Sequence, residues 1–211
     1  MYKDFESANN THCKVPNIFP SISASIGNYE PQSTIWKTAI YLHSPLRFFI
    51  LCLRWEYYRK VIREELDVIV NLAVFLNVVE NISLLGLTYW TSTANYSMHE
   101  KCFKTFIGTS VFYMLFVCVM LTKYRRRPLI THREKFSLKL KWRSFIVNVM
   151  SFALAAYFFL RHNSLCEPYV YSLFGFFEYI VVISNIVFHM STVYDLQINF
   201  IYVHQYGITT E

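Results

Sequence analysis

Five long apolar stretches constrain the fold of this sequence more than any other feature. They lie at about 34–54, 66–90, 105–124, 144–160 and 169–194. About 20 apolar residues can cross the roughly 30 Å hydrocarbon core of a bilayer as a helix. Because lipid offers the backbone no hydrogen bonds, we expect each stretch to be helical in spite of its β-branched and aromatic residues. The sequence therefore predicts an all-α, polytopic transmembrane helix bundle of about five spans.

Composition supports a membrane protein and excludes other classes. Charged residues make up 16% of the 211 residues and hydrophobic residues 54%, whereas a soluble domain carries about 25% charged residues. The high apolar content excludes intrinsic disorder. The five glycines and the lack of an internal period exclude collagen-like and repeat folds.

The formal net charge of +6 is concentrated in two segments. Nine of the 20 Lys and Arg residues lie between Lys123 and Arg143, and four more lie between the first two spans, at Arg54, Arg59, Lys60 and Arg63. Basic loops stay on the cytoplasmic side of a membrane. We therefore expect a luminal N-terminal segment at 1–33, a transmembrane bundle at 34–195, luminal loops at 91–104 and 161–168, and a cytoplasmic tail at 196–211. The charge is a topology signal, and no nucleic-acid partner is expected.

Three cysteines fall on the predicted luminal side, where disulfides persist. They are Cys13, Cys102 and Cys166, and three cysteines cannot all pair with one another. We favour a bridge between Cys13 and Cys166, which would tie the N-terminal segment to the last luminal loop. The alternative is that all three thiols are free.

The first span carries a basic pair beside a proline. His43 and Arg47 are four residues apart and share a helix face, and Pro45 between them kinks the helix. Such a kink could form a pocket for a phosphate, which the planar guanidinium of Arg47 suits. The alternative is that Arg47 neutralises a buried glutamate of a neighbouring span.

Acidic and amide groups recur in the second and fifth spans. Asn77, Glu80 and Asn81 lie together in the second span. In the fifth span, offsets of 7 and 4 residues place Glu178, Asn185 and His189 on one stripe. A Glu–His stripe is suited to general acid–base chemistry, and a structural polar network is the alternative. A metal site is not expected, because no second close His or Cys ligand accompanies the stripe.

The predicted luminal loop before the fifth span contains one further candidate. His162 and Glu167 have an H-x4-E spacing close to the H-x4-D of some glycerolipid acyltransferases, in which the His deprotonates a lipid hydroxyl. Gly-rich phosphate loops, G-x-S-x-G and H-E-x-x-H are absent from the sequence. A conventional serine hydrolase or zincin is therefore not expected.

Several stretches, in order and with matching spacing, resemble the Frag1/DRAM/Sfk1 family. They are Thr11–Asn17 running on to Pro20–Ala24, Tyr41–Phe48, Glu80–Ile82, His99–Glu100, Arg161–Asn163, Cys166–Glu167, Glu178–Tyr179 and Asn185–Met190. Family members usually carry one more span before the Thr-His-Cys segment, and we expect this chain to lack that first span.

The resemblance implies a multi-pass protein of the Golgi and endoplasmic reticulum membranes that acts in lipid remodelling of GPI anchors. Its partners would be membrane lipids, the lipid moiety of GPI-anchored proteins and other GPI-remodelling proteins. The implied step is reacylation of lyso-GPI at sn-2 with a saturated, typically stearoyl, chain from an acyl-CoA or a phospholipid, without a bound cofactor or metal. The alternative is a non-catalytic scaffold, lipid-presenting or lipid-transport protein.

If the protein is an acyltransferase, its predicted site residues divide into two groups. Catalytic roles are expected for His162, Glu178 and His189. Substrate binding is expected for His43, Arg47, Glu80 and Asn185.

Overall fold

A computed structural model of the chain describes residues 7–27, 29–129 and 131–196, and within these ranges the regular structure is helical. A short helix, α2 (Ile22–Ile26), precedes five long ones and a single 3-10 turn (Glu64–Leu66). The long helices are α3 (Gln32–Val61), α4 (Asp67–Tyr89), α5 (Tyr96–Lys123), α6 (His132–Leu165) and α7 (Val170–Met190). The predicted all-α helix bundle is confirmed.

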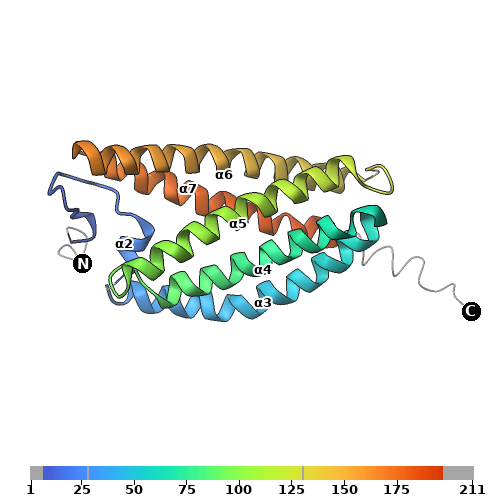
Figure 1. Cartoon of the computed structure of the whole chain (residues 1–211), viewed down its shortest axis with the longest axis horizontal. Coiled ribbons are helices and arrows are strands. Elements are labelled where there is room, and N and C mark those ends of the chain that lie inside the picture. The colour runs from blue at the N-terminus through green and yellow to red at the C-terminus, as the bar shows by residue number, and fades with distance from the viewer. Residues whose placement is uncertain (1–6, 28, 130, 197–211) are drawn as a thin grey trace, which may run out of the picture.

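The five long helices alternate in direction, so their connections gather at two ends of the bundle (Figure 1). Helices α3 and α4 pack together on one side, α6 and α7 pack on the other, and α5 crosses between the two pairs. One end holds α2, the α4–α5 connection and the start of α7. The other end holds the connections from α3 to α4 and from α5 to α6. We call these the α2 end and the basic end.

Each of the five predicted spans falls on one long helix. Among the described residues, four helical segments are long and apolar enough to cross a membrane: Glu64–Tyr89, Tyr96–Lys123, His132–Leu165 and Val170–Leu196. Helix α3 is long enough, but it contains Lys37, Arg47 and Arg54 and is not among the four. Of the tail predicted at 196–211, residues 197–211 lie outside the described part of the chain.

The helices extend further than the apolar stretches, and this corrects two assignments. Helix α3 continues to Val61, so Arg54 is a buried residue of the bundle and not part of a loop. Helix α6 begins at His132, so five residues of the predicted basic loop lie on a helix: Arg133, Lys135, Lys139, Lys141 and Arg143. A capping box between Thr131 and Glu134 starts α6 there, because it satisfies free backbone N–H groups of the first turn.

Lys141 shows how a charged side chain can enter the bundle. Its Nζ lies 2.6 Å from Oδ2 of Asp195 and 2.7 Å from Oγ of Ser137, and all three residues are buried. A paired charge of this kind avoids most of the cost of leaving water unpaired. The pair fixes α6 to the segment that follows α7.

The larger of two apolar core clusters among the described residues lies toward the basic end. It joins α3, α4, α5 and α7 through a cluster of buried side chains that includes Tyr57, Tyr58, Val70, Tyr113, Met114, Val117 and Phe188. At the α2 end, the N-terminal segment instead lies against α6 and α7. There a disulfide joins Cys13 to Cys166, the pairing favoured from the sequence. The disulfide therefore ties the N-terminal segment covalently to the α6–α7 connection at the α2 end.

Candidate functional site

A partly open cavity of about 720 Å³ is lined by residues of α2 to α7. Most of its wall is apolar, with Ile40, Leu84, Leu87, Phe103, Phe106, Phe152, Phe159, Phe174 and Val181 among the lining residues. Polar groups line it in two places. Ser23, His99 and Glu178 lie at the α2 end, and Arg47, Arg54, Asn185 and His189 lie deeper in the bundle. Such a wall suits a ligand with a long apolar part and a polar group.

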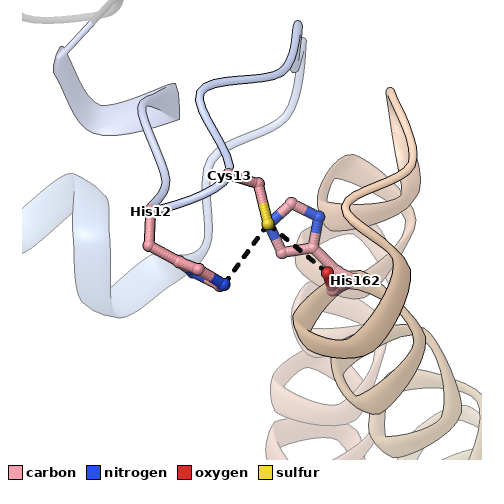
Figure 2. A group of neighbouring side chains, drawn as sticks. All are labelled: His12, Cys13 and His162. Carbon is pink, nitrogen blue, oxygen red and sulfur yellow. Dashed lines mark hydrogen bonds between the residues drawn. The ribbon is translucent and has the colours of Figure 1, made fainter.

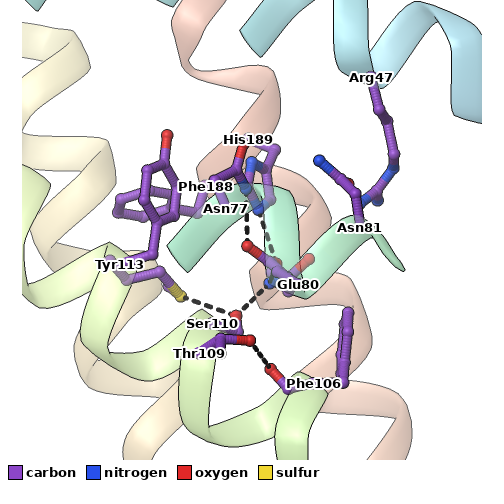
Figure 3. A network of polar contacts seen from close by, with 12 residues as sticks. Arg47, Asn77, Glu80, Asn81, Phe106, Thr109, Ser110, Tyr113, Phe188 and His189 are labelled. Atoms are coloured by element: carbon purple, nitrogen blue, oxygen red, sulfur yellow. Dashed lines mark hydrogen bonds and ion pairs between the residues drawn. The ribbon is translucent and has the colours of Figure 1, made fainter. Parts of the chain in front are cut away.

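The deeper polar groups converge on Glu80 of α4, whose side chain is fully buried (Figure 3). The amide of Asn77 donates to its Oε2 at 2.7 Å. On α7, the amide of Asn185 and Nε2 of His189 each lie 3.0 Å from Oε1. The Asn185 amide also donates to Oγ of Ser110 at 2.6 Å, which brings α5 into the network. Glu80 therefore links three helices through charge-assisted hydrogen bonds.

Both ring nitrogens of His189 are engaged. Nη1 of Arg54 lies 2.8 Å from Nδ1 of His189, and Nη2 donates to the His189 carbonyl at 2.9 Å. A guanidinium has no acceptor, so Nδ1 must be the accepting nitrogen and the ring proton sits on Nε2, facing Glu80. Tyr113 stacks on the ring with centroids 5.5 Å apart. His189 is thus a neutral bridge between Arg54 and Glu80, with no free lone pair in this arrangement.

His43 and Arg47 both line the cavity, one turn apart on α3. Nε of Arg47 donates to Nδ1 of His43 at 3.1 Å, and Nη1 donates to Oδ1 of Asn81 at 3.1 Å. Among the described residues, Arg47 makes no direct ion pair with Glu80, whose carboxylate instead bonds Asn77, Asn185 and His189. The guanidinium of Arg47 is therefore held by neutral partners and keeps its charge available to the cavity.

Glu178 anchors α2 at the other end of the cavity. Its Oε2 accepts the backbone N–H of Ile22 at 2.9 Å, and the side chain is largely buried. Ser21 caps the same turn, accepting from the backbone N–H of Ala24 and from the Tyr171 hydroxyl. A carboxylate at the start of a helix also interacts favourably with the helix dipole. The Glu178 side chain therefore positions the N-terminal segment over the cavity.

Close by, the side chains of Ser23 and His99 form a hydrogen-bonded pair. Oγ of Ser23 lies 3.0 Å from Nε2 of His99. Nδ1 of His99 lies 2.8 Å from the carbonyl oxygen of Trp90, which can only accept, so Nδ1 carries a proton. In the neutral ring, Nε2 then accepts the Ser23 hydroxyl proton. Both residues line the cavity.

His162 does not line this cavity and lies instead against the N-terminal segment. Its Nε2 lies 2.9 Å from Oγ1 of Thr11, and its ring contacts His12 edge-on at 5.7 Å. Figure 2 shows His12, Cys13 and His162 gathered at this point, where their ligand atoms lie within 4.8 Å of one another. The Cys13 sulfur belongs to the disulfide and is not a thiolate, which is the form that binds metal ions. This donor set does not fit a metal.

Near the Cys13–Cys166 disulfide, Arg161 forms an ion pair with Glu167. Two guanidinium nitrogens of Arg161 bond the two carboxylate oxygens, with Nη2 donating to Oε1 at 2.8 Å. These bonds favour the ionised carboxylate and lower the pKa of Glu167. The two side chains of the H-x4-E pair therefore have different partners, since Glu167 bonds Arg161 while His162 bonds Thr11.

The structure thus places the seven predicted site residues in three locations. Glu80, Asn185 and His189 meet in one network, and His43 and Arg47 face the cavity near it. Glu178 lies at the α2 end, and His162 lies outside the cavity. Arg54, Ser23 and His99 were not predicted as site residues. The family resemblance included Ser23 and His99 in its matching stretches, and that was the only sequence signal that marked them.

The fold and the cavity define a class, a multi-pass membrane protein whose helices line a mostly apolar, partly open cavity with polar groups at two levels. The particular family follows from comparison with known proteins. The chain belongs to the Frag1/DRAM/Sfk1 family, because the Frag1/DRAM/Sfk1/Cwh43P N-terminal domain matches residues 1–198.

Named relatives agree with this assignment. The chain is 47% identical over 192 residues to "Post-GPI attachment to proteins factor 2" of Drosophila pseudoobscura pseudoobscura, covering 91% of this chain and 75% of the relative. Identity and coverage are the same for the protein of that name from Drosophila melanogaster. "Acyltransferase PGAP2" of Xenopus tropicalis is 36% identical over 194 residues, covering 91% of this chain and 77% of the relative. No solved structure gives a significant match.

Proposed function

We propose that this protein acts in the lipid remodelling of GPI anchors and reacylates lyso-GPI at sn-2 with a saturated, stearoyl chain. The names of its relatives support the pathway. The single observation that carries the proposal is the apolar cavity of about 720 Å³ with a cation at its side and a Ser–His pair at one end. A lyso-GPI lipid combines the same elements, namely an apolar chain, an anionic phosphate and a free hydroxyl.

The two residue groups predicted from the sequence receive roles within this proposal. Arg47, with its neutral partners His43 and Asn81, would hold the phosphate. Glu80 and Asn185 would keep the cavity wall in place, because their side chains already bond one another. Glu178 would act through the N-terminal segment that it anchors. The roles of His162 and His189 as bases stay predictions.

One observation favours a second candidate function, in which the protein binds or presents the lipid without catalysis. Both nitrogens of His189 are bonded, and His162 lies outside the cavity. A lipid-binding chamber needs neither of them as a base. Under this alternative, the protein would assist a separate acyltransferase.

Location and partners follow from the pathway. We propose that the protein resides in the Golgi and endoplasmic reticulum membranes and meets the lipid moiety of GPI-anchored proteins there. The acyl donor would be an acyl-CoA or a membrane phospholipid. Other GPI-remodelling proteins would supply the lyso intermediate.

The test is an acyl-transfer assay on the purified full chain in lipid nanodiscs. Lyso-GPI is the acceptor, and isotope-labelled stearoyl-CoA and stearoyl phosphatidylcholine are supplied separately as donors. We expect labelled diacyl GPI with at least one donor. Folded protein that binds lyso-GPI but transfers no acyl chain from either donor would favour the non-catalytic function.

A matched pair of alanine-to-tryptophan substitutions tests whether the cavity is the site. Ala156 lines the cavity on α6, whereas Ala153 is exposed on the same helix and does not line it. Ala156→Trp would fill part of the cavity, and we expect it to lower acyl transfer and lyso-GPI binding about tenfold or more, which corresponds to roughly 1.4 kcal/mol. Ala153→Trp should leave both unchanged. Equal behaviour of the two variants would place the site elsewhere.

A further inference from the structure

We propose that Ser23 and His99 form a nucleophile–base pair and that the acyl group is carried as an ester on Oγ of Ser23. The inference rests on the proposed function and names the residues that would perform its chemistry. It concerns a pair that the sequence motifs for hydrolases and transferases do not mark, because the two residues are 76 positions apart.

The geometry matches what an activated serine requires. The nucleophile and its base lie 3.0 Å apart, within the roughly 2.6–3.2 Å expected for such a pair. A third group orients the base, since the Trp90 carbonyl holds the proton of His99 on Nδ1. Nε2 is thereby left as the nitrogen that accepts from Ser23. His99 is largely buried, so its ring is shielded from water.

Hydrogen bonds of Ser23 and its neighbouring residues hold Ser23 in place. The backbone N–H of the preceding residue, Ile22, is fixed by Glu178. The carbonyl of Ser23 accepts the Ser92 hydroxyl at 3.2 Å. Ser21 caps the turn through the N–H of Ala24. The reactive oxygen is therefore preorganised at the cavity wall, which is the condition under which positioning lowers a barrier.

His99 combines properties that the two histidines predicted as bases lack. His189 also lines the cavity, but Arg54 occupies its accepting nitrogen. The ring of His162 contacts Thr11 of the N-terminal segment and does not line the cavity. His99 accepts from a hydroxyl at the cavity wall and so faces a group that can react.

The proposed reaction has two balanced steps. In the first, Oγ of Ser23 attacks the carbonyl carbon of a donor ester or thioester while His99 Nε2 takes the hydroxyl proton. The bond to the donor's oxygen or sulfur breaks, and the leaving group receives that proton from His99. In the second, the sn-2 hydroxyl of the lyso lipid attacks the acyl-Ser23 ester, again with His99 as base, and the proton returns to Oγ of Ser23.

The first experiment measures transfer by the purified full chain and by variants. We expect Ser23→Ala and His99→Ala each to lower the transfer rate about 10²-fold or more, the lower end of what a positioned acid–base group contributes. Ser25→Ala is the matched control for the serine, because Ser25 lies on α2, does not line the cavity and donates to the Ser21 carbonyl. His132→Asn is the control for the histidine, because His132 is exposed at the basic end.

The second experiment detects the nucleophile directly, without turnover. A fluorophosphonate with an alkyl tail labels a serine only when its hydroxyl is activated, and the labelled peptide is identified by mass spectrometry. We expect labelling of Ser23, its loss in His99→Ala and its retention in Ser25→Ala. With labelled donor and no acceptor, the wild-type chain should also accumulate a stearoyl ester on the same peptide.

The outcomes separate this inference from the proposed function. If the wild-type chain transfers acyl groups and folded Ser23→Ala transfers them equally well, the serine nucleophile is overturned and the function stands. If Ser23 is labelled but no lyso lipid is acylated, the function is overturned and the activated serine stands. A wild-type chain that is active but unlabelled at Ser23, with normal activity in His99→Ala, overturns the pair as a whole.

Discussion

At the scale of single residues, the Glu80 network shows how a charge is kept inside the bundle. An ionised side chain at the centre of a bilayer costs about 2.5–3.5 kcal/mol on insertion scales. A single interhelical hydrogen bond in a membrane contributes only about 0.6 kcal/mol on average. Several bonds and an opposite charge are therefore needed together, and Glu80 has them in Asn77, Asn185, His189 and, through His189, Arg54.

This balance predicts strong coupling between Glu80 and Arg54. Glu80→Gln and Arg54→Met should each lower the free energy of unfolding by about 3 kcal/mol, because each leaves the other charge buried without its counter-charge. The double variant removes both charges, so its loss should be smaller than the sum of the single losses by about 1 kcal/mol or more. Reversible unfolding in mixed micelles measures all three.

Glu56→Gln is the control for this cycle, because it neutralises an exposed acid on α3. It should change the free energy of unfolding by less than about 0.5 kcal/mol. Strict additivity of the Glu80 and Arg54 losses would show that the two charges do not compensate each other.

The sequence identified part of this network and missed the rest for a physical reason. Glu80 and His189 were visible as ionisable residues in apolar runs. Their pairing was not visible, because it joins positions 109 apart and depends on how α4 and α7 face each other. Arg54 was counted with the loop charges, since its place in the bundle depends on the continuation of α3 to Val61. Ser23 was missed as a reactive group because a single hydroxyl leaves no periodic or charge signal.

At the scale of the elements, the packing of the N-terminal segment on α7 depends on Gly175. A Cβ placed on Gly175 would lie 3.0 Å from the carbonyl oxygens of Phe19 and Pro20, which are backbone atoms. No side chain can turn aside there, so the segment itself would have to move. Gly108 on α5 offers the opposite case, because a Cβ added there would meet no neighbouring atom within 4 Å.

The two glycines give a matched pair of predictions. Gly175→Ala should lower the thermal stability, because overpacking costs about 1–3 kcal/mol and exceeds the gain in helix propensity. Gly108→Ala should raise the free energy of unfolding by about 0.5–1 kcal/mol, since it gains propensity without a clash. Thermal unfolding followed by tryptophan fluorescence compares the two. Equal stabilisation by both would show that the segment does not pack tightly on α7.

The order and type of the elements could be predicted, whereas their ends could not. The apolar runs identified all five long helices because their length leaves the backbone no other solution in lipid. The start of α6 was missed by 12 residues, since charged residues were assigned to a loop. Lys141 could be recognised as a helix residue only with its partner Asp195, which lies 54 positions away.

At the scale of the whole molecule, the two ends of the bundle differ in chemistry. Arg125, Arg126 and Arg127 lie in the connection between α5 and α6 at the basic end. The Cys13–Cys166 bridge, the Ser23–His99 pair and the anchor at Glu178 lie at the α2 end. Disulfides persist in oxidising compartments, and basic loops remain in the cytoplasm. Two independent physical arguments therefore favour the same orientation, with the α2 end in the lumen.

This orientation predicts which ends of the bundle react with an impermeant thiol reagent. Single cysteines are introduced as Lys101→Cys at the α2 end and Pro128→Cys at the basic end, both at exposed positions. The background carries serine at Cys52, Cys102 and Cys118, the free cysteines of the described chain, and keeps the disulfide. In sealed microsomes whose cytoplasmic face points outward, we expect a maleimide that cannot cross the membrane to label Pro128→Cys at once and Lys101→Cys only after detergent is added.

The reverse pattern would place the α2 end in the cytoplasm, where the Ser23–His99 pair would meet soluble acyl-CoA directly. The expected pattern instead places the pair beside the luminal leaflet, so that a membrane phospholipid becomes the donor to test first.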